Sequence, residues 1–174
     1  MDRGLPDHYG ATIRVTLRYA IVMALSGALS GVAFQESSKQ LDFAGAPPGL
    51  HLEAVLGLAL VHGHVLVSAV LLPIAMVGAL LLAHRVGGRP LGRRPLLCLT
   101  RGYLSAVTAT LALMLYKGYH VLVLARMGER DLDAIHDRFF AGLTSLRMGV
   151  YGSCHAVRAV VLGAFLVGLW RSLK

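Results

Sequence analysis

Long apolar stretches separated by short polar ones dominate this chain. Four of the stretches approach or exceed the roughly 20 apolar residues that a helix needs to cross the hydrocarbon core of a bilayer. They lie at about residues 14–34, 54–83, 99–125 and 149–170. A soluble domain mixes polar residues through its helices every few positions. The pattern therefore predicts an all-α, four-helix transmembrane bundle, and 174 residues suit one domain covering 1–174.

The polar connection before the last apolar stretch carries a helical pattern of its own. Asp131 can cap a helix start, because its side chain can accept hydrogen bonds from free backbone N–H groups. Apolar residues then recur at helical spacing, at Leu132, Ile135, Phe139, Leu143 and Leu146. We expect a short helix at about 131–146 that lies in the outer interface, or that covers a site facing that side.

The composition agrees with a membrane protein, since 56% of the residues are hydrophobic and the mean hydropathy is +0.65. The net charge of +8 could suggest nucleic acid, but the basic residues are unevenly placed. The connection from His84 to Arg101 contains five arginines and no acid, and both terminal segments are basic. By the positive-inside rule, this connection and both termini are cytoplasmic. The charge thus reports topology, and no nucleic-acid partner is expected.

Several ionisable residues fall inside the expected helices, where they are costly and usually functional. Counted at about 1.5 Å per residue, they lie roughly 9–17 Å from the outer ends of their helices. They are His62 and His64 on the second helix, His120 and Lys117 on the third, and His155 on the fourth. Three helices therefore bring histidines to the outer half of one bundle.

Helical phase separates the two histidines of the second helix. Residues i and i+2 differ by about 200°, so His62 and His64 point to nearly opposite faces and cannot both bind one metal. We expect one of them to face the interior of the bundle. Two further stripes carry polar residues: Thr110, Tyr116, Lys117 and His120 on the third helix, and Tyr151, Gly152, His155, Arg158 and Ala159 on the fourth.

Histidines on separate membrane helices at equal depth fit a b-type haem, whose iron takes axial imidazoles from two sides. Small residues leave room for the macrocycle (Gly63, Gly152, Ala156), and cations suit its propionates (Arg126, Arg147, Arg158, Lys117). The expected cofactor-binding set is His62, His64, His120, His155, Lys117, Arg158 and Tyr151, with His62, His64 and His155 as metal ligands. Covalent c-type haem is excluded, because Tyr151 stands where the first cysteine of C-x-x-C-H would be.

Simpler roles compete for several of these residues. His120 can be a hydrated residue at a helix end, Lys117 can pair with Glu36, and Tyr151 can belong to an aromatic belt. Pro73 is expected to kink the second helix. Gly27 and Gly31 form a small-xxx-small pattern that suits close packing in lipid. Cys98 and Cys154 are expected at different depths, so we expect free thiols.

Four blocks of the sequence resemble a small bacterial integral membrane family of unknown function. They are GVAFQESSK (31–39), LVHGHVLVSAVLL (60–72), YKGYHVL (116–122) and YGSCHAVRAVVLGAFLVGLW (151–170). That family looks like a miniature of the haem-binding subunit of haem–copper oxidases and nitric oxide reductases. The resemblance implies a location in the bacterial cytoplasmic (inner) membrane. It also implies His62 as haem ligand, with His64 as the alternative and His155 as the partner.

The sequence departs from the family pattern where Lys117 replaces an arginine and Cys154 a glycine. It also lacks the three-histidine site of the large enzymes, so oxygen or nitric oxide reduction is not implied. The leading hypothesis is a haem b protein for electron transfer or sensing. Its expected partners are the lipid bilayer, a quinone or a redox protein, and a second copy of the same chain in a homo-oligomer. The alternatives are a non-haem copper, zinc or iron binding or transport protein, and a structural or assembly partner of a respiratory complex. Enzymatic activity is left open, since no nucleophile–base set can be assembled.

Overall fold

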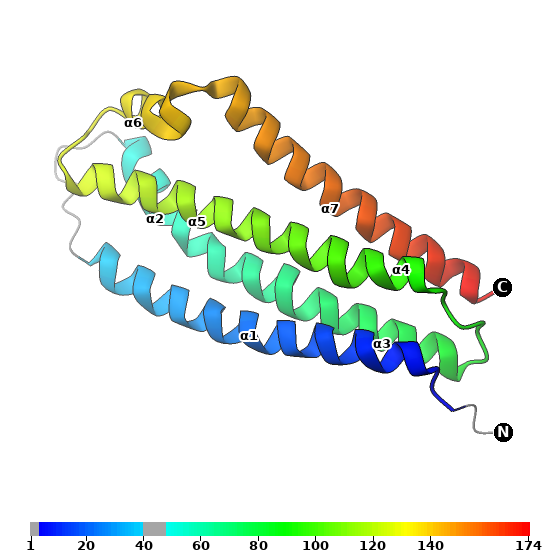
Figure 1. The fold of residues 1–174 in the computed structure, drawn as a ribbon. Coiled ribbons are helices and arrows are strands. Elements are labelled where there is room, and N and C mark those ends of the chain that lie inside the picture. The colour runs from blue at the N-terminus through cyan, green and yellow to red at the C-terminus, as the bar shows by residue number, and fades with distance from the viewer. Residues whose placement is uncertain (1–3, 40–47) are drawn as a thin grey trace.

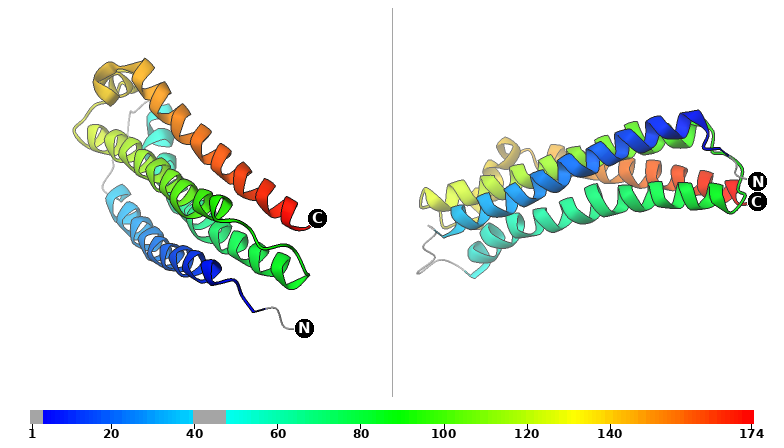
Figure 2. Two further views of the ribbon diagram at one scale, coloured as in Figure 1. Left: turned by 45° about the vertical axis from the view of Figure 1, so that its right-hand side comes forward. Right: turned by 90° about the horizontal axis from the view of Figure 1, so that it is seen from below.

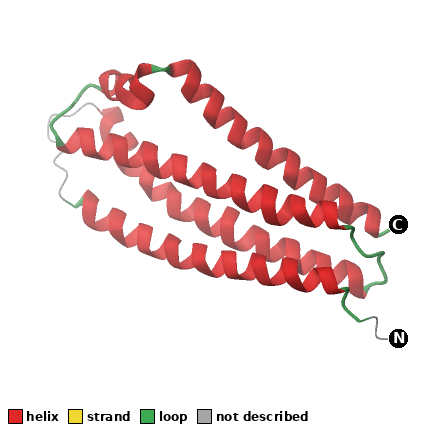
Figure 3. Ribbon diagram, viewed as in Figure 1, coloured by secondary structure: helices red, strands yellow, loops and turns green. Residues whose placement is uncertain are grey.

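The computed structural model describes residues 4–39 and 48–174, and every regular element in these ranges is helical (Figures 1 and 3). In chain order the elements are α1 (Asp7–Ser38), α2 (Pro48–His64), the π-helical η1 (Val65–Leu71), α3 (Leu72–Arg85), α4 (Arg93–Leu97), the π-helical η2 (Cys98–Tyr103), α5 (Leu104–Arg126), α6 (Leu132–Arg138), the 3₁₀-helical η3 (Phe139–Gly142) and α7 (Thr144–Ser172).

Within the described residues, four helices are long and apolar enough to cross a membrane. We call them the first to fourth spans: Asp7–Ser38, Gly49–Arg85, Arg93–Arg126 and Thr144–Ser172. Each span extends beyond its apolar stretch, because the helical backbone continues into the polar residues at both ends. The prediction of an all-α bundle with four membrane-crossing helices is confirmed, and the chain is a multi-pass membrane protein.

The four spans define two ends of the molecule. The start of α1, the end of α7 and the connection at 86–92 lie together at one end, called here the terminal end, and α6 lies at the opposite end, called the α6 end (Figure 1). The basic connection therefore shares one side of the bundle with the start of α1 and the end of α7. Their assignment to the cytoplasm stays a prediction from the positive-inside rule.

The third span is the centre of the bundle. The first span packs along the second, and α7 packs on α4, η2 and α5, so α1 and α7 lie on opposite sides of the molecule (Figure 2). Large side chains buried at this centre include Tyr9, Leu80, Leu99, Tyr103 and Phe165. The outer faces stay apolar: Leu29 is 71% exposed and Val160 69%. Such surfaces suit lipid, whose tails are as apolar as the side chains.

Glycines allow the spans to approach closely, as expected for helices in lipid. A Cβ built on Gly27 would lie 2.9 Å from Val65, and one built on Gly31 would lie 4.0 Å from His62. The predicted packing role of Gly27 and Gly31 is thus confirmed, with the second span as the neighbour. Gly118 of α5 is tighter still, since a Cβ there would lie 2.5 Å from Leu58.

The second span changes its winding from α-helical to π-helical just before Pro73, where a kink was expected. In η1 the N–H of Leu72 donates to the carbonyl of Val67 and not to that of Ser68. The next residue, Pro73, has no N–H, so the Ser68 carbonyl has no donor in its own helix. The hydroxyl of Tyr103 in η2 supplies one at 2.8 Å, and this bond is buried. The carbonyl left without a donor in the second span is therefore satisfied by a side chain of the third span.

We predict that Tyr103→Phe lowers the free energy of unfolding by about 1–3 kcal/mol, because it leaves a carbonyl unsatisfied where no water can replace the phenol. Thermal unfolding in detergent measures the change. Tyr19→Phe is the matched control, because the Leu104 carbonyl that Tyr19 contacts at 3.3 Å also accepts from Thr108 at 2.9 Å. Equal losses in the two variants would contradict the special role of the Ser68 carbonyl.

The short helix near 131–146 exists but ends early. Asp131 caps it as predicted, accepting from the backbone N–H groups of Asp133 and Ala134. The helix α6 stops at Arg138, and Phe140 and Ala141 have φ of 55° and 51°, in the left-handed region that L-residues avoid. Leu143 and Leu146, which the pattern assigned to this helix, lie beyond the break and are exposed. The prediction of one continuous helix to 146 is therefore wrong.

Candidate functional site

A cavity of about 480 Å³ opens at the α6 end, between α5, α6 and α7. Its walls combine charged groups with aromatic and sulfur-containing side chains. They are Lys117 of α5, Asp133, His136 and Asp137 of α6, Phe139 of η3, and Thr144, Arg147, Met148 and Tyr151 of α7. We call it the α6 cavity. It brings together Lys117 and Tyr151 from the expected site set, and α6 forms one of its walls.

The Lys117 ammonium pairs with a carboxylate of the second span. Its Nζ lies 3.3 Å from Oε2 of Glu53, and both side chains are about two-fifths exposed, at 42% and 40%. The expected alternative partner, Glu36, pairs instead with Lys39 at 2.6 Å. The pairing of Lys117 with Glu36 is therefore wrong, because the third span faces the second at this level. The Glu53–Lys117 pair also joins the second span to the wall of the α6 cavity.

The other charged groups of the α6 cavity are not neutralised by one another. Among the described residues, the side chains of Asp133, Asp137 and Arg147 form no ion pair. Their polar groups thus stay available to solvent or to a ligand at the mouth of the cavity. The sequence signal for this wall was the D-x-x-H-D spacing at 133–137, which places both carboxylates on one side of a helix. The sequence analysis did not propose Asp133, His136 or Asp137 for the site, whereas it named Arg147 among the cations.

His120 is held beside the α6 cavity by aromatic packing. Its ring centroid lies 5.2 Å from that of Phe139, which is buried, and 6.2 Å from that of Tyr116. Its Nε2 lies 3.1 Å from the carbonyl oxygen of Ile135 in α6. His120 therefore anchors α6 on α5.

Tyr151 connects α7 to α5. Its hydroxyl donates to the Leu113 carbonyl at 3.0 Å, while the ring lines the α6 cavity. The position of Tyr151 therefore identifies the side of α7 that faces α5 and the α6 cavity. The least exposed stripe of α7 runs through Arg147, Tyr151, Cys154, Arg158 and Phe165. His155 stands beside that stripe, so the predicted stripe through Gly152 and Ala159 does not face the core.

Arg158 lies in the middle of the fourth span on this inner stripe. It is partly buried and forms no ion pair with any carboxylate in the described part of the chain. It follows His155 by three residues and Tyr151, the nearest residue of α7 that lines the α6 cavity, by seven residues, which is about two turns. Cys98 and Cys154 are free thiols, as predicted.

His62 and His64 diverge as the helical phase predicted, but both side chains are exposed. The expectation that one of them faces the bundle interior is therefore wrong. His62 lies against α1, with its Cβ near Gly31. His64 follows Glu53 by eleven residues, which is about 20° more than three full turns, so both share one side of α2. His62 follows Glu53 by nine residues and lies about 180° away.

The side of α2 that carries Glu53 and His64 borders the α6 cavity through α5. Glu53 pairs with Lys117, and Lys117 shares the α6 cavity with Arg147 and Tyr151 of α7. On α7, His155 follows Tyr151 by one turn and lies within about 40° of it. His64 therefore lies on the same side of α2 as Glu53, and His155 lies on nearly the same side of α7 as Tyr151. Both histidines are nearer the membrane centre than the α6 cavity is.

The two imidazoles also lie at similar depths. Gly57 packs on Gly118, since a Cβ built on Gly57 would lie 3.9 Å from the Gly118 Cα. His64 lies seven residues further along α2, about 10 Å deeper, at the level of Leu111 of α5. Tyr151 is tied to Leu113, and His155 lies four residues beyond Tyr151, about 6 Å deeper, near the level of Ala109. The two histidines thus differ in depth by about 3 Å.

The ring of His64 has a defined orientation. Its Nδ1 lies 2.9 Å from the carbonyl oxygen of Leu60, one turn earlier in α2. A carbonyl only accepts, so Nδ1 carries the proton and Nε2 presents its lone pair. A metal-binding histidine usually has its other nitrogen bonded to a backbone carbonyl in this way. The exposed imidazole is therefore set for ligation at Nε2.

No group of three or more His, Cys, Asp or Glu side chains in the described ranges could hold a metal ion. A bare zinc or copper site needs about that many protein ligands. A haem brings four nitrogen ligands of its own and needs only axial partners from the protein.

Comparison of the chain with protein-family models, with curated proteins and with solved structures gave no match.

Proposed function

We propose that this protein binds haem b in the membrane, with His64 of α2 and His155 of α7 as axial ligands. The observation that carries the proposal is the hydrogen bond from His64 Nδ1 to the Leu60 carbonyl at 2.9 Å, which leaves Nε2 free on an exposed side of α2. Depth and helix side support His155 as the partner. In this proposal His64 replaces His62, because the His62 side of α2 lies against α1.

The surroundings of the two histidines support a flat ligand. Gly152 lies one turn before His155, and a Cβ built on it would meet no atom within 4 Å. Ala159, one turn after His155, is exposed as well. Leu60 and Val67 flank His64 and are 47% and 58% exposed, which supplies apolar surface for a porphyrin. These flanks are open where a macrocycle needs room.

The α6 cavity lies at the polar edge of this location. Lys117 and Arg147 are positioned about two turns nearer the α6 end than the histidines, and both suit the carboxylates of haem propionates. Arg147 has no carboxylate partner among the described residues, so it is available for that role. When bound, a bis-imidazole haem supplies one-electron transfer, and this chain's residues bind and orient it.

The optical spectrum of the purified full chain, expressed with ample haem, tests the proposal. We expect a Soret band, with sharp α and β bands after reduction by dithionite, and about one haem per chain or per pair of chains. Metal analysis on the same sample gives iron in the same ratio. A colourless protein that is folded and helical by circular dichroism would overturn the proposal, and zinc or copper in its place would favour a non-haem metal protein.

A further inference from the structure

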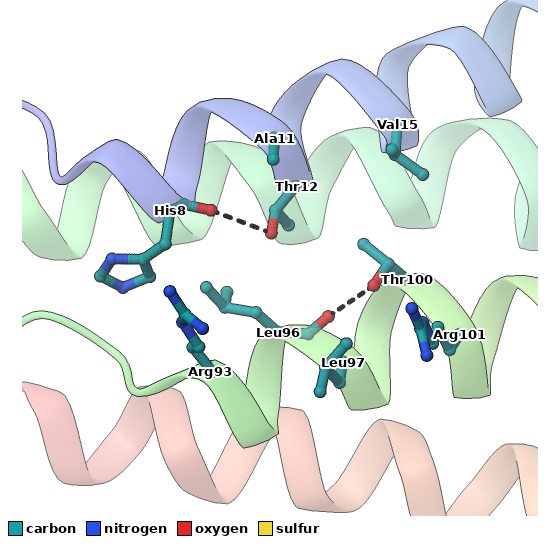
Figure 4. Close-up of a pocket in the computed structure, with 9 residues that line it drawn as sticks. All are labelled: His8, Ala11, Thr12, Val15, Arg93, Leu96, Leu97, Thr100 and Arg101. Carbon is teal, nitrogen blue, oxygen red and sulfur yellow. Dashed lines mark hydrogen bonds between the residues drawn. The ribbon is translucent and has the colours of Figure 1, made fainter.

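A second groove runs along the other side of the bundle, at the terminal end. It begins as a cavity of about 530 Å³ between α1 and the first turns of the third span (Figure 4). The α1 wall consists of His8, Ala11, Thr12 and Val15, and the facing wall of Arg93, Leu96, Leu97, Thr100 and Arg101. We call it the terminal groove. It shares no residue with the α6 cavity or the histidines of the proposed haem site.

The terminal groove is positively charged. Arg93 and Arg101 are exposed and form no hydrogen bond or ion pair with another described side chain. No carboxylate lines the groove. Figure 4 shows Arg93 near the ring of His8 at one end and Arg101 at the other, with Leu96, Leu97 and Thr100 between them. Two unpaired guanidinium groups thus flank a mostly apolar floor.

The remaining polar groups of the terminal groove are already engaged. His8 Nε2 lies 2.9 Å from the Leu91 carbonyl oxygen. The hydroxyls of Thr12 and Thr100 donate to carbonyls of their own helices, at 3.4 and 3.0 Å. The arginines are therefore the donors left for a ligand, and guanidinium is the side-chain group that best matches a phosphate.

A second, apolar cavity continues the terminal groove towards the membrane centre. It measures about 530 Å³ and shares Val15 and Thr100 with the first cavity. Its other lining residues are Tyr19, Leu104, Ser105, Thr108, Ala109 and Ala112. From Arg93 to Ala112 the third span rises about 28 Å, and one leaflet with its headgroups measures roughly 20–22 Å. The two cavities together are long enough to hold a phospholipid, and they change from cationic to apolar along their length as a phospholipid does.

We propose that the terminal groove binds an anionic phospholipid of the leaflet at the terminal end. Its phosphate lies between Arg93 and Arg101, and one acyl chain follows the apolar cavity along Tyr19 and Ala109. Basic pockets between transmembrane helices recognise anionic lipid headgroups through charge-assisted hydrogen bonds. A neutral lipid offers no net charge to the two arginines, so the site discriminates by headgroup.

Native mass spectrometry of the full chain in detergent tests the proposal, by titration with dioleoylphosphatidylglycerol or dioleoylphosphatidylcholine. We expect preferential retention of phosphatidylglycerol, and an affinity for it about thirtyfold weaker in Arg93→Gln/Arg101→Gln, which corresponds to ~2 kcal/mol. The control Arg85→Gln/Arg94→Gln removes the same charge from exposed positions outside the groove and should stay within about threefold of the parent protein.

A variant of unchanged charge tests the acyl-chain part of the groove. Ala109→Phe fills the apolar cavity, and we expect weaker phosphatidylglycerol binding with both arginines intact. This variant also keeps the test valid if the double arginine variant misfolds. Equal retention of the two lipids, equal loss in the control, or displacement of the lipid by 10 mM inorganic phosphate would overturn the proposal, the last by identifying a site for a free anion.

Discussion

His64→Ala and His155→Ala are each expected to abolish haem binding, whereas His62→Ala retains it. Both ligands are needed because a single axial imidazole leaves the haem held from one side, and the helix sides that carry His64 and His155 both lead to the α6 cavity. The His62 side of α2 lies against α1. The measurement is the haem-to-protein ratio of each purified variant by the pyridine haemochrome method.

His62→Ala is the matched control, since it removes the same group two residues away on the opposite side of one helix. A helical circular dichroism spectrum should accompany each variant, so that loss of haem is separated from loss of fold. Loss of haem in His62→Ala together with retention in His64→Ala would reverse the assignment of the ligand. Retention in all three variants would remove these histidines from the site altogether.

Gly118→Val is expected to have the largest effect on the fold, lowering the free energy of unfolding by about 2–3 kcal/mol or preventing assembly. A Cβ at Gly118 would lie 2.5 Å from Cδ2 and 2.7 Å from Cγ of Leu58, which is only 3% exposed. Because Leu58 is buried, it cannot move into solvent or lipid, and we expect the second and third spans to separate. Thermal unfolding in detergent, followed by circular dichroism, measures the effect.

Gly163→Val in α7 is the control for Gly118→Val. It makes the same change in a membrane-spanning helix, but a Cβ at Gly163 would meet no atom within 4 Å. We expect its unfolding temperature to stay close to that of the unaltered chain. Comparable destabilisation by both substitutions would mean that valine itself, and not the contact with Leu58, weakens the helices.

The sequence predicts the helical spans well, because a bilayer imposes the same requirement on every crossing segment. Hydrocarbon cannot satisfy backbone groups, so a long apolar stretch has to be helical over its whole length. The break of the second connection at Phe140 was not predictable in this way. Its residues keep an apolar spacing up to Leu146, but the backbone leaves the helix so that Phe139 can bury its ring beside Tyr116 and His120.

The π-helical turns also depended on partners outside their own helices. Pro73 predicted a local disturbance, since it lacks an N–H for its preceding turn. The form of that disturbance depends on Tyr103, thirty residues later, whose hydroxyl reaches the Ser68 carbonyl at 2.8 Å. The spacing of residues within one helix carries no information about a hydrogen-bond donor that another helix supplies.

Some features of the candidate site could likewise be predicted from the sequence, and others depended on the tertiary structure. Helical periodicity alone determined that His62 and His64 point apart, and the depth of the histidines followed from a fixed rise per residue. Which of the two lies on the side of α2 that leads to the α6 cavity was decided by the tertiary structure, through the contact of Glu53 with Lys117. Local geometry is set by covalent structure and backbone hydrogen bonds, so the sequence determines it. The rotation of one helix against another is set by side chains that meet only after the bundle has packed.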